Sequence, residues 1–273
     1  MAGETAAEVL FRGLVDDAGL FPPAALSMAA ALARHSADRD GASPVLSHRF
    51  ICPAERLSEL STHLEGEIDL LLLCPLDARL PAALDAVRAD DRLRLAAVEG
   101  VISESEPPVE TGVPVYAEVP VRGQWEPLLD KAASWGLSVK VRCGGTTAAL
   151  FPTAAELGGL IHRCVARGLS FKATAGLHHA LPYRDEATGF SHHGYLNLLL
   201  AAARAVGGAS AAETAAAFEV AEAAQACAEL QAIDLEQARA TRALFSSYGS
   251  CSTSEPLEDL TALGLLADGA RAR

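Results

Sequence analysis

The chain has 273 residues, and half of them are apolar, so it is large and hydrophobic enough to bury the core of an α/β domain. Its formal net charge of −13 and its pI near 5.0 argue against nucleic acid or an anionic membrane as a partner, because both bind clustered Lys and Arg. The longest apolar run, Leu70 to Leu76, is too short to cross a bilayer.

The cysteines and the first residues indicate the compartment. The six cysteines are spread along the chain without a CxxC pair, which is typical of reduced, buried residues. The segment from Met1 to Glu8 lacks the basic region of a secretory signal. We therefore expect a cytoplasmic protein. Because no linker, charge run or internal repeat divides the chain, we expect residues 1–273 to form a single domain.

Short apolar runs alternate with amphipathic stretches, a pattern that is typical of βα units around a parallel sheet. The expected strands are Leu14–Asp16, Val45–Cys52, Asp69–Cys74, Leu93–Glu99, Val113–Val119, Ser138–Cys143, Leu169–Thr174 and Ala243–Tyr248. The expected helices are Ser27–His35, Ala54–His63, Arg79–Arg88, Gln124–Trp135, Ala154–Arg167, Gly194–Val206, Ala211–Leu230 and Pro256–Leu266.

This alternation predicts a TIM-type (β/α)8 barrel with a helical insertion between the last two strands. The alternative is an open doubly wound sheet, but the chain has no GxGxxG or P-loop for the nucleotide that such a sheet often binds.

Polar side chains gather where the barrel would place an active site, at the C-terminal ends of the strands. Strands one, four, five, six and seven carry, in that order, Asp16, Glu99, Glu118, Lys140 with Arg142, and Lys172. A barrel without chemistry would be apolar at these positions, so the pattern favours an enzyme.

Two lysines lie inside apolar runs that end in glycine. Side-chain alternation places Lys140 with Arg142, and Lys172 with Thr174, on the face that lines the barrel mouth. A lysine in a buried strand is destabilising unless it is paired or used, and desolvation lowers its pKa and makes its amine a nucleophile. The alternative is that both lysines reach solvent or form structural ion pairs with the glutamates of strands four and five.

The lysine strands resemble the deoxyribose-phosphate aldolase group of class I aldolases. Val139-Lys140-Val141 leads through one helix to Phe171-Lys172-Ala173-Thr174-Ala175-Gly176, similar to that group's phenylalanine-x-lysine-threonine-serine-threonine-glycine segment, although Ala173 departs from it. Tyr248-Gly249-Ser250-Cys251-Ser252 also resembles the group's phosphate loop before its last helix. The resemblance covers the second half of the chain. It implies a TIM-barrel lyase in which Lys172 forms the Schiff base.

Four of the eight histidines form two pairs, His178-His179 and His192-His193. They follow strand seven, so we expect a loop over the barrel mouth that contributes at least one histidine as an acid or base. Loop packing and helix capping are the alternative roles.

A last candidate site lies in Gly249-Ser250-Cys251-Ser252, just before the final helix. Ser250 and Ser252 could hold a phosphate or carboxylate with the backbone N–H groups of the helix start, and a simple N-cap by Ser254 explains the same residues. The helix N-terminus would lower the pKa of Cys251, but we favour a packing role for it.

The first functional hypothesis is a lyase that acts on a small carbonyl compound, anionic or neutral, through a Schiff base and without a cofactor. Lys172 attacks the carbonyl, Lys140 lowers the pKa of Lys172 by charge repulsion, and Glu118, His178 or His179 moves protons. Substrate binding is assigned to Asp16, Arg142, His192, His193, Gly249, Ser250 and Ser252.

The second hypothesis is a metal-dependent hydrolase or isomerase. One histidine of each pair would hold zinc or manganese together with Glu118 and either Asp16 or Asp17, although HxH and HExxH spacings are absent. The third is a non-catalytic binding barrel, which the polar strand ends disfavour. In each case the partner is a small molecule, and a homo-oligomer is compatible with the sequence.

Overall fold

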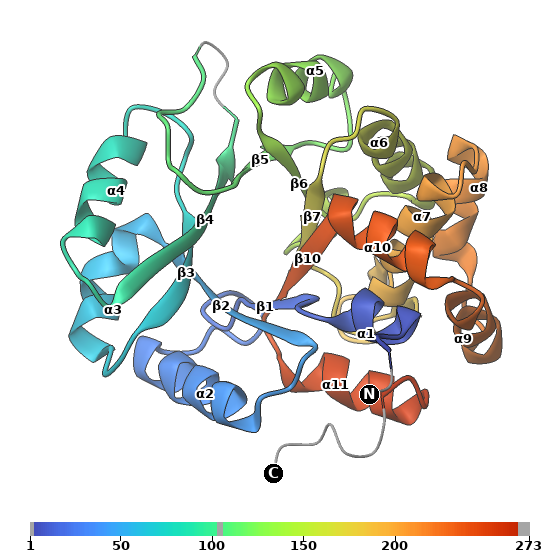
Figure 1. Ribbon diagram of the computed structural model, residues 1–273, viewed down its shortest axis with the longest axis horizontal. Coiled ribbons are helices and arrows are strands. Elements are labelled where there is room, and N and C mark those ends of the chain that lie inside the picture. The colour runs from blue at the N-terminus through green and yellow to red at the C-terminus, as the bar shows by residue number, and fades with distance from the viewer. Residues whose placement is uncertain (1–2, 103–105, 267–273) are drawn as a thin grey trace.

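Figure 1 shows a computed structural model of the chain, which describes residues 3–102 and 106–266. Eight parallel strands close into a barrel in the order β1-β10-β7-β6-β5-β4-β3-β2. The strands are β1 (Val15–Asp17), β2 (Leu46–Pro53), β3 (Ile68–Leu73), β4 (Leu93–Val101), β5 (Val115–Val119), β6 (Ser138–Arg142), β7 (Phe171–Thr174) and β10 (Phe245–Ser250). The predicted TIM-type barrel is confirmed, and the open sheet is wrong.

Helices surround the barrel (Figure 1). Those outside the insertion are α1 (Ala6–Phe11), α2 (Met28–Gly41), η1 (Ala54–Arg56), α3 (Leu57–His63), α4 (Leu80–Arg88), α5 (Glu126–Ser134), η2 (Ala148–Leu150), α6 (Ala154–Ala166) and α11 (Ser254–Ala262). The insertion between β7 and β10 contains β8 (Tyr183–Arg184), β9 (Ser191–His192), α7 (Tyr195–Val206), α8 (Ala211–Ala216), η3 (Ala217–Glu219), α9 (Ala223–Gln231) and α10 (Leu235–Leu244). Across the described ranges, no helix has the length and apolarity needed to cross a membrane.

One predicted helix is wrong. The segment Ala211–Leu230, expected as a single helix, is divided into α8, η3 and α9. The buried side-chain amide of Asn197 donates hydrogen bonds to the carbonyls of Ala217 at 2.7 Å and Val220 at 2.8 Å. Because this tertiary contact occupies carbonyls that a continuous helix would use, it overrides the helical propensity of the segment.

The last strand begins later than predicted, because residues 243–244 belong to α10. It then runs to Ser250, with a register shift between Phe245 and Tyr248. The shift allows both aromatic rings, three residues apart, to join the outer core. Helices α1 and α10 are additions to the predicted set.

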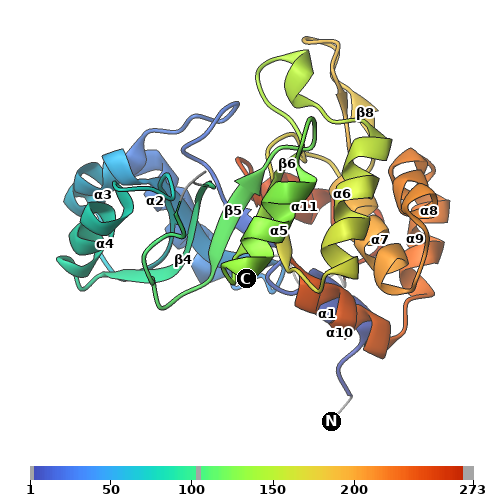
Figure 2. The same ribbon diagram turned by 90° about the horizontal axis from the view of Figure 1, so that it is seen from above.

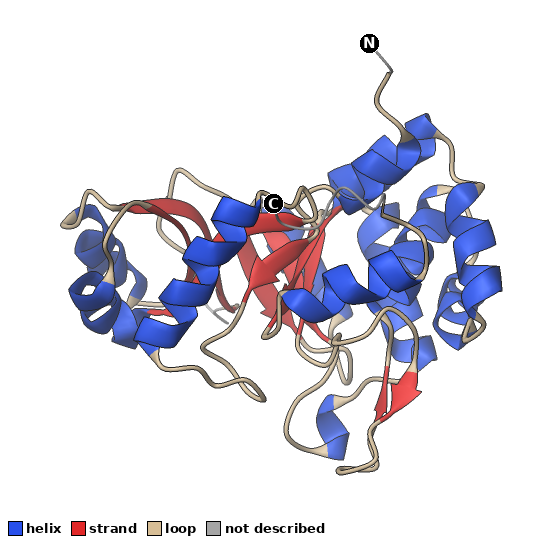
Figure 3. Cartoon of the chain, turned by 90° about the horizontal axis from the view of Figure 1, so that it is seen from below, coloured by secondary structure: helices blue, strands red, loops and turns tan. Residues whose placement is uncertain are grey.

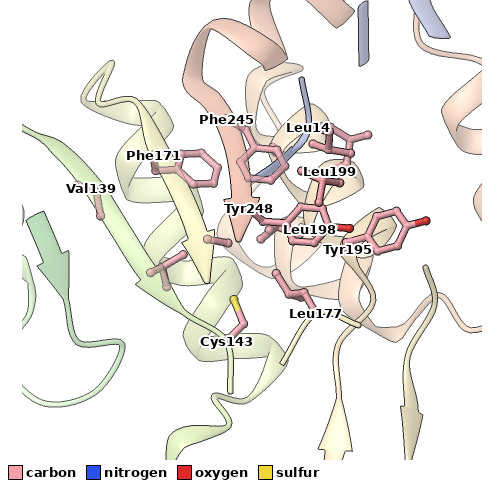
Figure 4. Close-up of a cluster of buried hydrophobic side chains, with 14 of the residues drawn as sticks. Leu14, Val139, Cys143, Phe171, Leu177, Tyr195, Leu198, Leu199, Phe245 and Tyr248 are labelled. Carbon is pink, nitrogen blue, oxygen red and sulfur yellow. The ribbon is translucent and has the colours of Figure 1, made fainter. Parts of the chain in front are cut away.

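Apolar side chains join the outer face of the barrel to its helices. Figure 4 shows this layer where β6, β7 and β10 meet α7. Phe171 stacks on Phe245 with 5.2 Å between ring centroids, and Tyr195 stacks on Tyr248 at the same separation. All four are fully buried, and each such side chain contributes on the order of 1.5–3 kcal/mol to folding.

The interior of the barrel combines a small apolar cluster with buried charges. The apolar cluster consists of Ala18, Ile51, Leu71, Ala97 and Tyr116 and is separate from the outer core. The buried charged side chains are Asp16, Glu99, Lys140 and Lys172, from four different strands. Because such barrels are usually filled by branched apolar residues, these charges mark the candidate site.

The β8–β9 hairpin stands beyond the barrel, next to the segment that carries η2 (Figures 2 and 3). The two segments touch through aromatic rings: Phe151, which follows η2, lies 5.1 Å from Phe190 and 4.7 Å from His192 between ring centroids. Both segments follow the C-terminal ends of lysine-bearing strands, so together they form a wall above the barrel mouth.

Candidate active site

Two carboxylates enclose Lys172 inside the barrel. Its Nζ donates hydrogen bonds to Asp16 Oδ2 at 2.7 Å and to Glu99 Oε1, and its side chain is 1% exposed. Asp16 also accepts hydrogen bonds from Arg49 Nε at 2.9 Å and from Ser247 Oγ at 2.7 Å. β1, β2, β4, β7 and β10 therefore meet in one buried network of charges.

These charges hold Lys172 in its protonated form. Burial alone lowers the pKa of Lys172, but the charges of Asp16 and Glu99 outweigh burial and raise that pKa above its usual value. Burial also disfavours the charged form of Asp16 and so raises its pKa. The positive charges of Lys172 and Arg49 outweigh burial and lower the pKa of Asp16 to about 2. The expected lowering of the pKa of Lys172 is therefore wrong, because the closing barrel brings in Asp16 from 156 residues away.

Lys140 pairs in register with Lys172 on the neighbouring strand β6. Its Nζ lies 3.1 Å from Glu99 Oε2 and 3.1 Å from Glu118 Oε2. Arg142 Nε in turn lies 3.3 Å from Glu118 Oε1. Glu99 thus bridges the two lysines, and the ion pairs with glutamates that the sequence offered as an alternative are present.

A cavity of about 670 Å³ lies at the C-terminal ends of the strands. Lys140, Arg142 and Glu99 line it, whereas Lys172 and Asp16 are not among the described residues that do. Asp16 therefore belongs to the buried network of charges around Lys172. It was predicted to bind substrate, but it does not line the cavity. Glu118 also does not line the cavity, but it forms ion pairs with Lys140 and Arg142, which do.

Two glycines allow β6 and β7 to approach each other at this cavity. A Cβ atom on Gly144 would lie 2.7 Å from Gly176 Cα, and one on Gly176 would lie 2.9 Å from Cys143 O. Gly176 also has a φ of +73°, which side chains rarely allow. These contacts explain why both lysine-bearing runs end in glycine.

The structure brings three of the four loop histidines to the cavity, namely His178, His179 and His192. His192 Nδ1 donates a hydrogen bond to Gly176 O at 3.0 Å, so its Nε2 is the acceptor in the neutral ring. His193 turns away, with Nε2 donating to Pro152 O at 2.7 Å. Adjacent side chains of an extended segment point to opposite faces, so His193 is not placed to bind substrate as predicted.

His178 lies between a carboxylate and a thiol. Its Nδ1 is 3.6 Å from Glu255 Oε2 and 3.7 Å from Cys251 Sγ. Burial lowers the pKa of His178 and raises the pKa of Cys251, so both are neutral near pH 7. Cys251 is buried and also lines the cavity, so the packing role favoured for it stays a prediction. His179 is more exposed, with Nδ1 3.3 Å from Asp259 Oδ2.

The loop between β10 and α11 is divided between the cavity and the helix. Gly249 and Ser250 line the cavity, and Ser250 Oγ is buried without a hydrogen-bond partner in the described part of the chain. Ser252 is outside the lining, and its Oγ accepts a hydrogen bond from the backbone N–H of Glu255 at 3.3 Å. Ser252 therefore binds the first turn of α11 from outside the cavity, and the prediction that it binds an anion is not supported. The N-cap of α11 is Thr253, so Ser254, the first residue of the helix, is not the N-cap that the sequence suggested.

The sequence prediction missed Arg49, Ser247 and Tyr116, whose ring centroid lies 5.5 Å from Lys172 Nζ. Arg49 and Tyr116 occupy inward positions of their strands, so side-chain alternation identifies them once the inward face is known. A second signal is the scarcity of lysine. Only three of the 22 Lys and Arg residues are lysines, and two of these three lie in the network.

Among residues 3–102 and 106–266, no group of three or more His, Cys, Asp or Glu side chains is arranged to hold a metal ion. The ligands expected for one have other partners: Asp16 and Glu118 contact Lys172 and Lys140, respectively, and His192 donates to a backbone carbonyl.

No family model matches the chain, and no curated protein or solved structure matches it either. The chemistry of the site is therefore the guide to function.

Proposed function

We propose that the protein is an enzyme that binds a carbonyl compound at the barrel mouth and activates it as a Schiff base on Lys140, as lyases of the aldolase type do. One observation carries the proposal: Lys140 lines a ligand-sized cavity, and its amine lies 3.1 Å from each of two carboxylates. Addition to a carbonyl needs an amine, a nearby proton acceptor and room for the substrate, and these three meet there.

Lys140 is better suited to this reaction than Lys172, the lysine that the sequence favoured. Lys172 lies below the cavity, and its raised pKa keeps it cationic. We assign Lys172 a positioning role. Its charge balances Asp16 and Glu99, so Glu99 is shared between two cations and holds Lys140 less tightly than it would alone.

The reaction begins with transfer of a proton from Lys140 to Glu118, whose side chain is 21% exposed and can exchange the proton with water. The neutral amine then forms a C–N bond to the carbonyl carbon, and the carbonyl oxygen takes up a proton. Loss of this oxygen as water leaves an iminium ion.

Cleavage uses the iminium nitrogen as the acceptor of electrons. A base removes the proton of the substrate's β-hydroxyl, the Cα–Cβ bond breaks, and its electron pair moves to the iminium group to give an enamine. Protonation of the enamine and addition of water release the second product and restore the amine. His178 suits the role of base, because it lines the cavity and burial lowers its pKa.

Borohydride trapping tests this proposal. The protein is incubated with a panel of aldehydes and ketones that includes acetaldehyde, acetone, pyruvate and cinnamaldehyde, then reduced and mapped by peptide mass spectrometry. Because the chain has only Lys131, Lys140 and Lys172, every lysine adduct can be assigned. We expect Lys140 to gain the mass of one carbonyl compound less one oxygen atom.

The variant Lys140→Arg keeps a cation between the two glutamates and removes the reactive amine. Lys131→Arg makes the same change on the outer helix α5 and serves as the control. Labelling should disappear in the first variant and persist in the second. An adduct on Lys172, or equal labelling of Lys131 and Lys140 across the panel, contradicts the proposal.

A further inference from the structure

We infer that the carbonyl compound accepted at this site has a planar, apolar body, such as an aryl or arylvinyl group, which binds in a slot between two apolar walls above Lys140. The inference rests on the proposed function for the carbonyl carbon, and on the size and lining of the cavity for the rest of the ligand.

The size of the cavity is the first argument. An aldehyde of three heavy atoms displaces roughly three water molecules, or about 90 Å³ of liquid. The cavity of about 670 Å³ falls within the range that holds ligands of ten or more heavy atoms. A two- or three-carbon carbonyl compound would leave most of this space filled with water, so the site is built for a larger substrate.

One wall of the slot is aromatic and comes from two separate segments. Phe151 follows η2, and Phe190, Tyr183 and His192 belong to the β8–β9 hairpin; all four line the cavity. The rings of Tyr183 and His192 are stacked at 4.6 Å and 21°, and Phe151 meets the edge of His192 at 4.7 Å. The hydrogen bond from His192 to Gly176 O ties this wall to the end of β7, so the wall is formed before a ligand binds.

The opposite wall is aliphatic and aromatic, and it comes from the side of the barrel where β2 and β3 lie across from β6 and β7. Phe21, Pro22, Ile51 and Leu73 line the cavity there. Ile51 belongs to the apolar cluster inside the barrel, and Phe21 and Leu73 pack against that cluster, so the wall has a rigid support. A flat ring between two such walls buries both of its faces, and aromatic contacts stabilise it beyond the effect of the area buried.

The charges at the cavity favour this body over a phosphate. The two strand cations that line it, Lys140 and Arg142, already contact Glu99 or Glu118. Asp185 and Glu255 add two further carboxylates to the lining. An anionic group would have to displace these contacts or face these carboxylates, whereas an apolar ring requires neither.

The test compares cinnamaldehyde with acetaldehyde in the trapping experiment, each scored as the ratio of labelling at Lys140 to labelling at Lys131 in the same sample. This ratio removes the difference in intrinsic reactivity between the two aldehydes.

We expect the concentration for half-maximal labelling at Lys140 to be at least about ten-fold lower for cinnamaldehyde, the fold-change that about 1.4 kcal/mol of aromatic contact produces. Phe151→Leu, which keeps an apolar side chain without the ring, should remove most of this preference. Phe11→Leu makes the same change on α1, away from both the cavity and Lys131, and should leave the preference unchanged.

Binding of cinnamyl alcohol, measured by calorimetry, separates this inference from the proposed function, because the alcohol cannot form an imine. If it binds and Phe151→Leu weakens it while no aldehyde labels Lys140, the slot stands and the Schiff-base proposal fails. If acetaldehyde and cinnamaldehyde label Lys140 equally well, the proposed function stands and the slot is overturned. If the alcohol fails to bind at millimolar concentration, the slot is likewise overturned.

Discussion

Lys140 and Lys172 lie side by side in register on adjacent strands, yet the barrel treats them differently. Lys172 is 1% exposed and held by Asp16 and Glu99 below the cavity. Lys140 lines the cavity and shares Glu99 with it, while its other partner, Glu118, is partly exposed. Both side chains are buried, and the difference is that Lys140 lines the cavity whereas Lys172 does not.

The comparison teaches that burial does not by itself make a lysine reactive. Burial lowers the pKa of Lys172, but two carboxylates at contact distance reverse the sign of the shift. Reactivity requires in addition that the amine faces a space for the substrate and that a neighbouring acid can carry its proton away. Only Lys140 meets both conditions among the described lysines.

The largest expected difference between the two lysines is in stability. Lys172→Met leaves Glu99 and Asp16 buried without their shared cation, and the loss of one partner from a buried ion pair costs about 3–5 kcal/mol. Lys140→Met should cost less, about 1–3 kcal/mol, because the cavity allows water to reach the carboxylates that are left. Urea unfolding followed by circular dichroism measures both.

Lys131→Met on the outer helix α5 is the control for this comparison and should change the free energy of unfolding by less than about 1 kcal/mol. Equal losses of stability for Lys172→Met and Lys140→Met would show that both lysines belong to one closed network, and this would contradict the assignment of Lys140 as the reactive amine.

The difference in stability between the native protein and Lys172→Met should depend on pH more than the corresponding difference for Lys140→Met. In the native protein the folded pKa of Asp16 is about 2 and that of Glu99 is also lowered, so their stabilisation is present above the unfolded pKa, roughly 4, and is lost as the pH falls toward 2. In Lys172→Met burial should raise the pKa of Glu99, and protonation then relieves its buried charge. The stability gap between the two proteins should therefore narrow from pH 7 to about pH 4.

Unfolding curves at several pH values in this range test the expectation. Lys140→Met should show a smaller narrowing, since its other partner, Glu118, is 21% exposed and water can reach it, whereas the other partner of Lys172, Asp16, is fully buried. If the difference in free energy of unfolding between the native protein and Lys172→Met stays constant with pH, the variant is destabilised by lost packing and not by unpaired charge.

Most of the fold could be predicted because it depends on local patterns. A strand such as β3 is an apolar run between two helices, and side-chain alternation correctly turned Lys140 and Lys172 inward. The division of the predicted helix 211–230 could not be foreseen, because it depends on a hydrogen bond from Asn197 on another helix.

The site was less predictable, because its geometry depends on closure of the barrel. Periodicity finds an inward lysine, but it does not show that Asp16 of the first strand reaches Lys172 and not Lys140. The same limit applies to His192 and His193. Alternation predicts that only one of them faces the cavity, and the pairing of His192 with Tyr183 in the hairpin decides which one.

A smaller effect on chemistry is expected from Glu118→Gln. The amide keeps the size of the side chain but cannot take a proton from Lys140, so imine formation should slow about 100-fold, a typical contribution of a proton-transfer group. The rate is measured as labelling of Lys140 against time with cyanoborohydride present. Glu59→Gln, on the outer helix α3, is the control. An unchanged rate would assign the proton transfer to Glu99 or to water.

The smallest expected effect is a difference in stability between substitutions of two buried serines of β10. Ser247 belongs to the network around Lys172, and Ser250 lines the same cavity as Lys140. Ser247 is 1% exposed and its Oγ donates to Asp16 at 2.7 Å within the closed network. Ser250 is 3% exposed, lines the cavity, and its Oγ has no partner among the described residues.

Ser247→Ala should lower the free energy of unfolding by about 1–3 kcal/mol, because a buried charge loses a hydrogen bond. Ser250→Ala removes a hydroxyl that is buried without a partner, so stability should stay the same or rise by up to about 1 kcal/mol. If Ser250→Ala destabilises the protein as much as Ser247→Ala does, the hydroxyl of Ser250 has a structural partner such as a bound water. In that case Ser250 belongs with Lys172 to the closed part of the barrel, and not with Lys140 to the wall that meets the ligand.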